Sequence, residues 1–309
     1  MQKNKTEIKY FILTALIISL PTLVFFILAT FVIQIINSSI GWQILTLYGF
    51  ALILAFIITA GWAIFNPALS DAMLTLRRLL RFESLSNPLL LRLSIQAPGT
   101  YHHSLNVSNL SQRASKSIGA NSLLVRTAAY YHDVGKLEQP MNFIENQAES
   151  EIPQSESAEK IRGSAHTIIA HVKNGMKIAK ENNLPDEIID LIAEHHGTTK
   201  AWYFYKKAVE KGLKIKKTDF RYPGPKPQSK ESAILMIADC AEATARAEQN
   251  LTKESISQIV NNTISERLEE NQFKNSDLTE NDLIKIKKSM ISTLLSIYHQ
   301  RMRYSQNYD

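Results

Sequence analysis

An adjacent histidine and aspartate, His132 and Asp133, give the sequence its clearest chemical signal. Gly135 and Lys136 follow closely, and further residues with metal-binding side chains lie elsewhere in the chain: His103, His171, His195, His196 and Asp239. Imidazole nitrogens combined with carboxylates suit divalent transition metals such as iron, manganese or zinc. Five histidines and two aspartates exceed what one ion needs, so we predict two metal ions that share a ligand.

A pair of metal ions suits the hydrolysis of a phosphate ester, which is anionic and repels hydroxide. Two cations about 3.5–4 Å apart can bind the phosphate oxygens and hold a hydroxide as the nucleophile. Asp133 is the candidate for the shared ligand because its neighbour His132 would bind the same cluster. Two such ions outweigh two carboxylates and one hydroxide in charge, so the cluster would still attract an anionic ester.

Helical spacing indicates how these residues are positioned. His103, Val107, Leu110 and Ala114 recur at helical intervals, and Gly119 suits the end of that helix. The other predicted helices are Leu123–Tyr131 leading into His132, Ile168–Ala179 with His171, Ile234–Ala247 with Asp239, and a last helix up to Arg303 that the pair Thr279 and Asp282 would cap.

The adjacent histidines His195 and His196 lie at the end of one more predicted helix, which Pro185 opens. Neighbouring side chains on a helix point about 100° apart. Both histidines can therefore reach one metal only where the helix stops, and Gly197 marks such an end.

The chain shows no set of strands and no internal repeat, so the predicted fold class is all-α. Two segments are predicted as loops. Residues 147–159 are rich in glutamate and serine, and residues 211–229 contain clusters of lysine and proline.

Two uncharged apolar runs, 10–36 and 41–65, predict an N-terminal two-helix transmembrane hairpin. Lysines in the tail 1–9 and arginines after the second run place both ends in the cytosol by the positive-inside rule. A cleaved signal peptide is the competing interpretation of the first run, but its length and the lack of a cleavage site argue against it. Residues 66–96 would form a connecting helical stalk, or simply the first helices of the domain that follows, 97–309.

Composition limits the function without deciding it. The 309 residues are 45% hydrophobic and 21% charged, with a net charge of +6. This modest positive excess fits an anionic substrate or a membrane surface. We see no basic stripe interleaved with aromatic residues, so no DNA or RNA partner is expected. The single cysteine, Cys240, cannot form an internal disulfide and fits a reducing compartment.

Five sequence blocks in this order resemble the HD superfamily of metal-dependent phosphohydrolases, and more narrowly the HD domain of seven-transmembrane cyclic-di-AMP phosphodiesterases. The resemblance runs from about Arg81 to about Arg303. The blocks are Ala97–Ser104, His132–Lys136, His171–Val172, Glu194–Thr199 and Arg221–Pro227.

The resemblance implies a ligand scheme. His103, His132, Asp133 and Asp239 would hold one divalent metal, and Asp133, His171, His195 and His196 would hold the other. Asp133 and Lys136 would serve catalysis, with Lys136 either pairing with a substrate phosphate or supporting Asp133. Substrate-binding residues would be Tyr101, Arg221, Tyr222 and Lys226. Manganese or iron suits the mixed ligand set better than zinc, which prefers four ligands.

The resemblance also implies the reaction and the location. Cyclic-di-AMP would be opened to the linear dinucleotide pApA, although related proteins act on cyclic-di-GMP. The enzyme would be anchored in the cell (inner) membrane as a multi-pass protein through residues 10–65, with the HD domain in the cytoplasm. The family carries an extracellular sensing domain and seven spans, of which this sequence shows two spans. The oligomeric state is not predicted.

Two other functions compete with this one. The first is a mononuclear HD nucleotide phosphohydrolase acting on dNTPs or guanosine alarmones, which would leave His171, His195 and His196 without a clear role. The second is a catalytically inactive, membrane-tethered cyclic dinucleotide-binding module. Such a module has no need of the full set of metal ligands.

Overall fold

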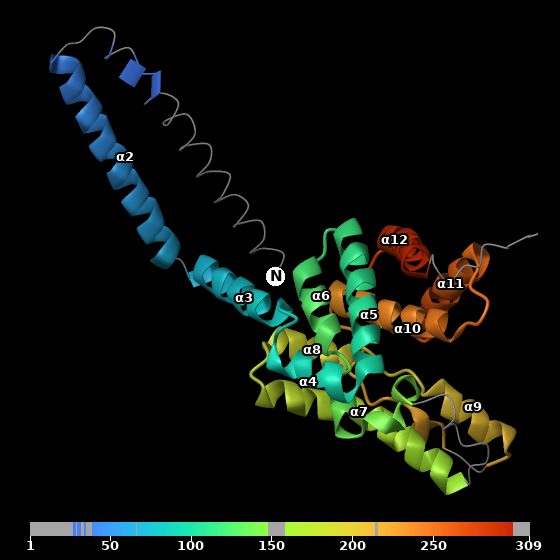
Figure 1. The fold of residues 1–309 in the computed structure, drawn as a ribbon. Coiled ribbons are helices and arrows are strands. Elements are labelled where there is room, and N and C mark those ends of the chain that lie inside the picture. Colours follow the sequence, from blue (N-terminus) through green and yellow to red (C-terminus); the bar gives the residue numbers. More distant parts are fainter. Residues whose placement is uncertain are drawn as a thin grey trace, which may run out of the picture. The chain divides into compact units, whose positions relative to one another are not determined.

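The computed structural model describes residues 39–65, 67–147, 158–213 and 216–298, together with five positions between 27 and 34. Its α-helices (Figure 1) are α2 (Ser39–Phe65), α3 (Pro67–Glu83), α4 (Pro88–Gln96), α5 (Pro98–Ser117), α6 (Ser122–Tyr131), α7 (Ala158–Glu181), α8 (Asp186–Glu194), α9 (Trp202–Glu210), α10 (Lys230–Ala247), α11 (Lys253–Glu269) and α12 (Glu280–Tyr298). Short 3-10 helices are η1 (Val134–Glu138), η2 (Pro140–Asn142), η3 (Ile144–Asn146) and η5 (Lys217–Phe220).

Extended pairing in the described residues is limited to an isolated bridge between Lys200 and Arg221. The all-α prediction is therefore confirmed for this part of the chain. Residues 1–78 and 79–309 form two compact units.

The predicted transmembrane hairpin finds no support. Most of the run 10–36 and the whole tail 1–9 lie outside the described residues. Among the residues that the structure describes, no helix is both long enough and apolar enough to cross a membrane.

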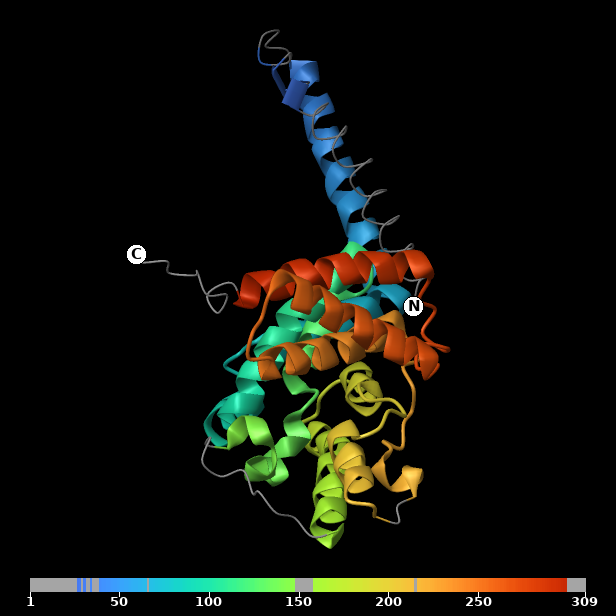
Figure 2. The ribbon, with the colours of Figure 1, turned by 90° about the vertical axis from the view of Figure 1, so that its right-hand side faces the viewer.

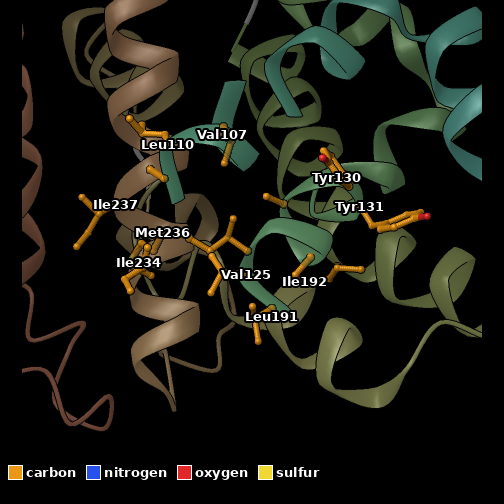
Figure 3. Packing of buried hydrophobic residues seen from close by; sticks show 14 of the residues in the cluster. Val107, Leu110, Val125, Tyr130, Tyr131, Leu191, Ile192, Ile234, Met236 and Ile237 are labelled. Atoms are coloured by element: carbon orange, nitrogen blue, oxygen red, sulfur yellow. The ribbon is translucent and has the colours of Figure 1, made fainter. Parts of the chain in front are cut away.

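The apolar core of the unit 79–309 lies where α5 packs against α6, α10 and α12, and where α6 packs against α8. Figure 3 shows buried side chains from these helices pointing toward one another, among them Val107 and Leu110 of α5, Val125 of α6, Ile192 of α8 and Met236 of α10. Burying each such side chain stabilises a fold by about 1.5–3 kcal/mol. The core thus fixes the helices on which most of the candidate ligands lie.

The segment that follows Arg78 contributes to this same core. Leu79 and Phe82 of α3 and Leu89, Leu90 and Leu93 of α4 are buried in it. The hydroxyl of Tyr131 donates to the backbone oxygen of Phe82 over 2.8 Å. Residues 79–96 therefore pack into the same core as the helices that follow them.

Several predicted helix ends are confirmed. α5 ends at Ser117, and Gly119 follows with a φ of 71°, a value that favours glycine. Thr279 and Asp282 cap α12 reciprocally, because the Asp282 backbone N–H donates to the Thr279 hydroxyl and the Thr279 N–H donates to the Asp282 carboxylate. As Figure 2 shows, α12 lies beside α11 and α10.

Other details differ from the prediction. α7 begins at Ala158, ten residues before the predicted start, and α10 begins at Lys230, where Ser229 supplies a capping box. The helices α9 and α11 were not predicted at all. Residues 148–157 of the first predicted loop lie outside the described residues. The described residues of the second loop include η5 and otherwise lack regular structure.

Candidate metal centre

Seven predicted ligands converge from five helices of the unit 79–309. His103 lies on α5, His132 and Asp133 directly follow α6, His171 lies on α7, His195 and His196 directly follow α8, and Asp239 lies on α10. Their ligand atoms form two groups, each with all atoms within 4.8 Å of one another. The first group is His103, His132, Asp133 and Asp239; the second group is Asp133, His171, His195 and His196.

Asp133 belongs to both groups because its two carboxylate oxygens face opposite ways. Oδ2 lies 3.3 Å from Nε2 of His132 and 3.7 Å from Nε2 of His103. Oδ1 lies 3.2 Å from Nε2 of His171 and 3.9 Å from Nε2 of His195. One carboxylate can therefore serve two ions, one through each oxygen.

Asp239 completes the first group from the opposite side. Its Oδ1 lies 3.0 Å from Nε2 of His103 and 3.6 Å from Nε2 of His132. Its Oδ2 lies 3.6 Å from Nδ1 of His196. Both carboxylates thus face imidazoles, as a cation site requires.

Three of the histidines are oriented by their own helices. Nδ1 of His132 contacts the backbone oxygen of Ala129 at 2.8 Å, and Nδ1 of His195 contacts that of Ile192 at 2.7 Å. His171 makes the same contact with Ile168. Because a carbonyl only accepts, each Nδ1 carries the proton and each Nε2 presents its lone pair to the cluster.

His103 is oriented differently, by a buried carboxylate. Its Nδ1 pairs with Oε2 of Glu242. Glu242 Oε1 in turn accepts from Nδ2 of Asn106 and from the hydroxyl of Tyr298, each over 3.0 Å. A carboxylate behind a histidine fixes the ring and makes its other nitrogen a stronger ligand.

The cluster contains buried polar atoms that a metal ion would satisfy. Nε2 of His132 and Oδ1 of Asp133 are buried without a hydrogen-bond partner. Nε2 of His171 and Nε2 of His195 lie 3.3 Å apart. With protons on both Nδ1 atoms, these two lone pairs repel each other unless a positive ion lies beside them. The residues present therefore fit divalent metals.

The first group attracts protons in the absence of metal. Burial lowers the pKa of His132, but Asp133 and Asp239 outweigh this and raise it to about 10. The pKa of His103 is likewise raised: burial opposes this, yet Asp239 and Glu242 prevail.

Two histidines of the second group, His195 and His196, bind protons more weakly than usual. Burial and the neighbouring His132 and His171 lower the pKa of His195 to about 3. Burial together with His195 holds the pKa of His196 well below its ordinary value. The two groups therefore differ in charge although they share Asp133.

Lys136 stands next to the shared carboxylate. Its Nζ lies 2.7 Å from Oδ2 of Asp133 and 2.6 Å from Oε1 of Glu145. Burial raises the pKa of Asp133, but Lys136 and His132 hold it well below its usual range. Glu145 also accepts from the hydroxyl of Thr100 over 3.1 Å, which ties the lysine to the start of α5.

The turn after α8 allows both adjacent histidines to reach the cluster, as the sequence predicted. α8 ends at Glu194, and Gly197 has a φ of 53°. This left-handed backbone favours glycine, and a Cβ there would in addition press on the side-chain oxygen Oε1 of Gln272 at 2.5 Å. His195 is buried, whereas the His196 side chain keeps 24% of its surface exposed.

The predicted substrate residues lie at different places. The Tyr222 ring stacks on His196 with centroids 4.2 Å apart and meets His171 edge-on. Arg221 is exposed, and its guanidinium donates to the backbone oxygen of Thr198. Of these two residues, only Tyr222 contacts the ligand cluster.

The other two substrate candidates are engaged elsewhere. The Lys226 ammonium donates to the backbone oxygen of Asn271 over 3.0 Å. Tyr101 packs against the apolar core and the ring of His102, and neither it nor Lys226 has a contact with the seven ligands.

The sequence reasoning missed Glu242 and Glu145. Glu242 follows Asp239 by three positions on α10, which places both on one helix face. That spacing was the available signal. Glu145 offered no comparable signal, because it reaches Lys136 from a separate 3-10 helix.

Comparison with known proteins agrees with this geometry. The HD domain pattern matches residues 100–244. The chain is 42% identical over 234 residues to the cyclic-di-AMP phosphodiesterase PgpH of Bacillus subtilis; the match covers 76% of this chain and 33% of that protein. The chain thus spans about a third of the length of this relative.

Two solved structures of the L. monocytogenes PgpH HD domain are also similar. One covers 69% of this chain and 100% of its own, with 43% identity and a TM-score of 0.65. The other, in complex with cyclic-di-AMP, covers 71% and 100% with the same identity and TM-score. From the site geometry and these matches, we conclude that the chain belongs to the HD domain family, close to the HD domain of PgpH.

Proposed function

We propose that the chain is a metal-dependent phosphodiesterase that hydrolyses cyclic-di-AMP to pApA with two divalent ions. The observation that carries this proposal is the Asp133 carboxylate, which offers one oxygen to each ligand group. A mononuclear site would have no use for the second group. The substrate choice is supported by the similar proteins, which are named for cyclic-di-AMP, and by the PgpH HD domain solved with that ligand.

Manganese or iron is the proposed metal. Bound ions would supply Lewis acidity toward the phosphate and lower the pKa of a water molecule. His103, His132, Asp133 and Asp239 would hold one ion, and Asp133, His171, His195 and His196 the other. The overall reaction adds one water, breaks one phosphorus–oxygen bond of the ring, and leaves a proton on the departing 3′ oxygen.

The proposed task of Lys136 is to hold Asp133 ionised and fixed. Its ammonium is within 2.7 Å of both Asp133 and Glu145. This favours support of the shared carboxylate over direct pairing with a substrate phosphate, the two roles that the sequence left open.

Tyr222 is the proposed substrate contact nearest to the ions, because its ring covers His196. Arg221, Lys226 and Tyr101 remain proposals for more distant parts of the substrate. The exposed guanidinium of Arg221 suits an anionic group.

The test is an activity assay on the full chain, reduced and supplied with Mn²⁺ or Fe²⁺. Cyclic-di-AMP, cyclic-di-GMP and a dNTP mixture are offered, and products are separated by chromatography. We expect cyclic-di-AMP to give pApA, and we expect Asp133→Ala to abolish this. Asp190→Ala, on the exposed side of α8, is the matched control and should retain turnover.

Other outcomes would replace the proposal. Hydrolysis of dNTPs with one ion per chain would establish the mononuclear alternative. Tight binding of cyclic-di-AMP with two ions and no product would establish the inactive binding module.

Attachment to a lipid bilayer through residues 10–65, with the HD domain on the cytoplasmic side, is a separate proposal that rests on sequence alone. Its support is the two uncharged runs and the basic residues that flank them. Recovery of the full chain in the membrane fraction after a carbonate wash is expected, and recovery in the supernatant would refute it.

A further inference from the structure

A half-open cleft of about 100 Å³ lies beside the second ligand group. Its walls come from η1 and the turn after η2 on one side and from α7 on the other. Gly135 and Phe143 line the first wall, and Thr167, His171 and Asn174 line the second. Because His171 belongs to both the cleft and the ligand group, a molecule in the cleft would adjoin the metal centre.

The cleft depends on an unusually close approach of two backbones. A Cβ on Gly135 would lie 1.9 Å from the backbone oxygen of His171 and 2.4 Å from the nitrogen of Gly175. Only glycine permits this approach. On α7, Thr167, His171 and Asn174 are spaced by four and three residues, so they form a single stripe along the helix.

Two polar groups on this stripe have no partner among the described residues. Neither the Thr167 hydroxyl nor the Asn174 amide forms a hydrogen bond with another residue in the described part of the chain. By contrast, Asn106, Asn146 and Asn182 on other surfaces are all engaged. Phe143 is buried opposite, with its ring edge-on to His171 at 5.9 Å.

We propose that this cleft binds one adenine edge of the cyclic dinucleotide and that Asn174 reads it. This inference rests on the proposed function. An asparagine amide places a donor beside an acceptor, and adenine presents the complementary pair at N7 and its amino group. Guanine presents two acceptors there, so the amide oxygen would face an acceptor and lose its hydrogen bond. Phe143 and His171 supply the apolar and aromatic surface that a planar base needs.

The experiment compares three phosphodiesters on the full chain loaded with Mn²⁺: cyclic-di-AMP, cyclic-di-GMP, and bis(p-nitrophenyl) phosphate, which has no base. Asn174→Ala should lower kcat/KM for cyclic-di-AMP by roughly 5- to 150-fold, the range expected for losing one bidentate base contact. The ratio of kcat/KM between cyclic-di-AMP and the ester without a base should fall by a similar factor. Thr167→Val, which keeps the side-chain shape, should lower the same ratio by a smaller factor. Asn109→Ala, exposed on α5, is the matched control.

Several results would overturn the proposal. An equal loss on all three esters, accompanied by loss of Mn²⁺, would mean that Asn174 only supports His171. An unchanged ratio in both variants would remove the base-binding role. If the wild type hydrolyses none of the three, the proposed function fails. Calorimetric titration with cyclic-di-AMP then tests separately whether the cleft binds the base. Weaker cyclic-di-AMP binding by Asn174→Ala than by wild type would support the cleft, and equal binding would overturn it.

Discussion

The two ligand groups share Asp133 but are built in different ways. The first group lies among carboxylates: Asp239 faces its histidines, and Glu242 orients His103 from behind. In the second group, backbone carbonyls orient His171 and His195, and the ring of Tyr222 covers His196. The first group thus contains two carboxylates and is enclosed, whereas the second contains only the shared Asp133 and borders solvent at His196. A first ion would therefore meet two carboxylates, whereas a second would meet only the shared one.

The largest effect should come from removing the carboxylates one at a time. Asp133→Ala removes an oxygen ligand from both groups, whereas Asp239→Ala removes one from the first group only. We expect metal analysis of the purified variants to show loss of both ions in the first case and of one ion in the second. Loss of a single ion in both variants would contradict the shared role of Asp133.

The next effect concerns Glu242, which orients a ligand without belonging to either group. Glu242→Gln keeps the size and the contacts to Asn106 and Tyr298 but removes the charge behind His103. We expect Mn²⁺ affinity of the first group to fall by about 10- to 100-fold, with the second group unchanged. Calorimetric titration measures this.

Two further variants sharpen the Glu242 result. Glu242→Asp should restore part of the affinity, and Tyr298→Phe should lose less than Glu242→Gln. An equal loss in both groups would mean that the variant merely loosens the fold.

The two ligand groups should differ in how their affinity for Mn²⁺ changes with pH. At the first group an ion must displace protons from His103 and His132, the latter with a pKa of about 10. Affinity there should rise with pH, by up to about tenfold per unit for each proton displaced. At the second group His195, with a pKa of about 3, is already unprotonated near neutrality, so little change is expected.

Calorimetry between pH 6.5 and 8.5, in buffers with different ionisation heats, measures both affinity and proton release. If metal affinity rose equally with pH at both groups, the expected difference in proton release between them would be refuted. In the metal-free protein the raised pKa of His132 stabilises the fold below about pH 6.5, and this contribution should be lost as pH approaches 10.

The smallest effect should be on stability, through the glycine that brings η1 against α7. Gly135→Ala would force a Cβ into the backbone of His171, so we expect a loss of about 1–3 kcal/mol. At roughly 2–4 °C per kcal/mol this lowers the Tm measurably. Gly163→Ala, on the same helix with nothing within 4 Å of the added carbon, should instead raise stability by about 0.5–1 kcal/mol. An unchanged Tm in Gly135→Ala would show that the fold does not require this close approach of the two backbones.

The ligands could be predicted because metal chemistry restricts residue types and because the sequence blocks resemble a known family. Helices such as α5 followed from apolar spacing and a terminal glycine. α9 escaped prediction because its aromatic residues, Trp202 to Tyr205, are consecutive and show no helical period. Glu242 escaped because a buried glutamate and a solvated one look alike in a sequence; only the packing of α12 against α5 and α10 distinguishes them.

The 3.3 Å contact between the bare nitrogens of His171 and His195 has a consequence for folding. A protein that gathers unshared electron pairs in its interior carries a penalty that disappears when the cations arrive. Metal supply and conformational stability are therefore thermodynamically linked: free metal at a hundred times its dissociation constant adds about 2.7 kcal/mol to the folded state. Starvation for the ion would thus reduce the amount of folded protein as well as its catalytic turnover.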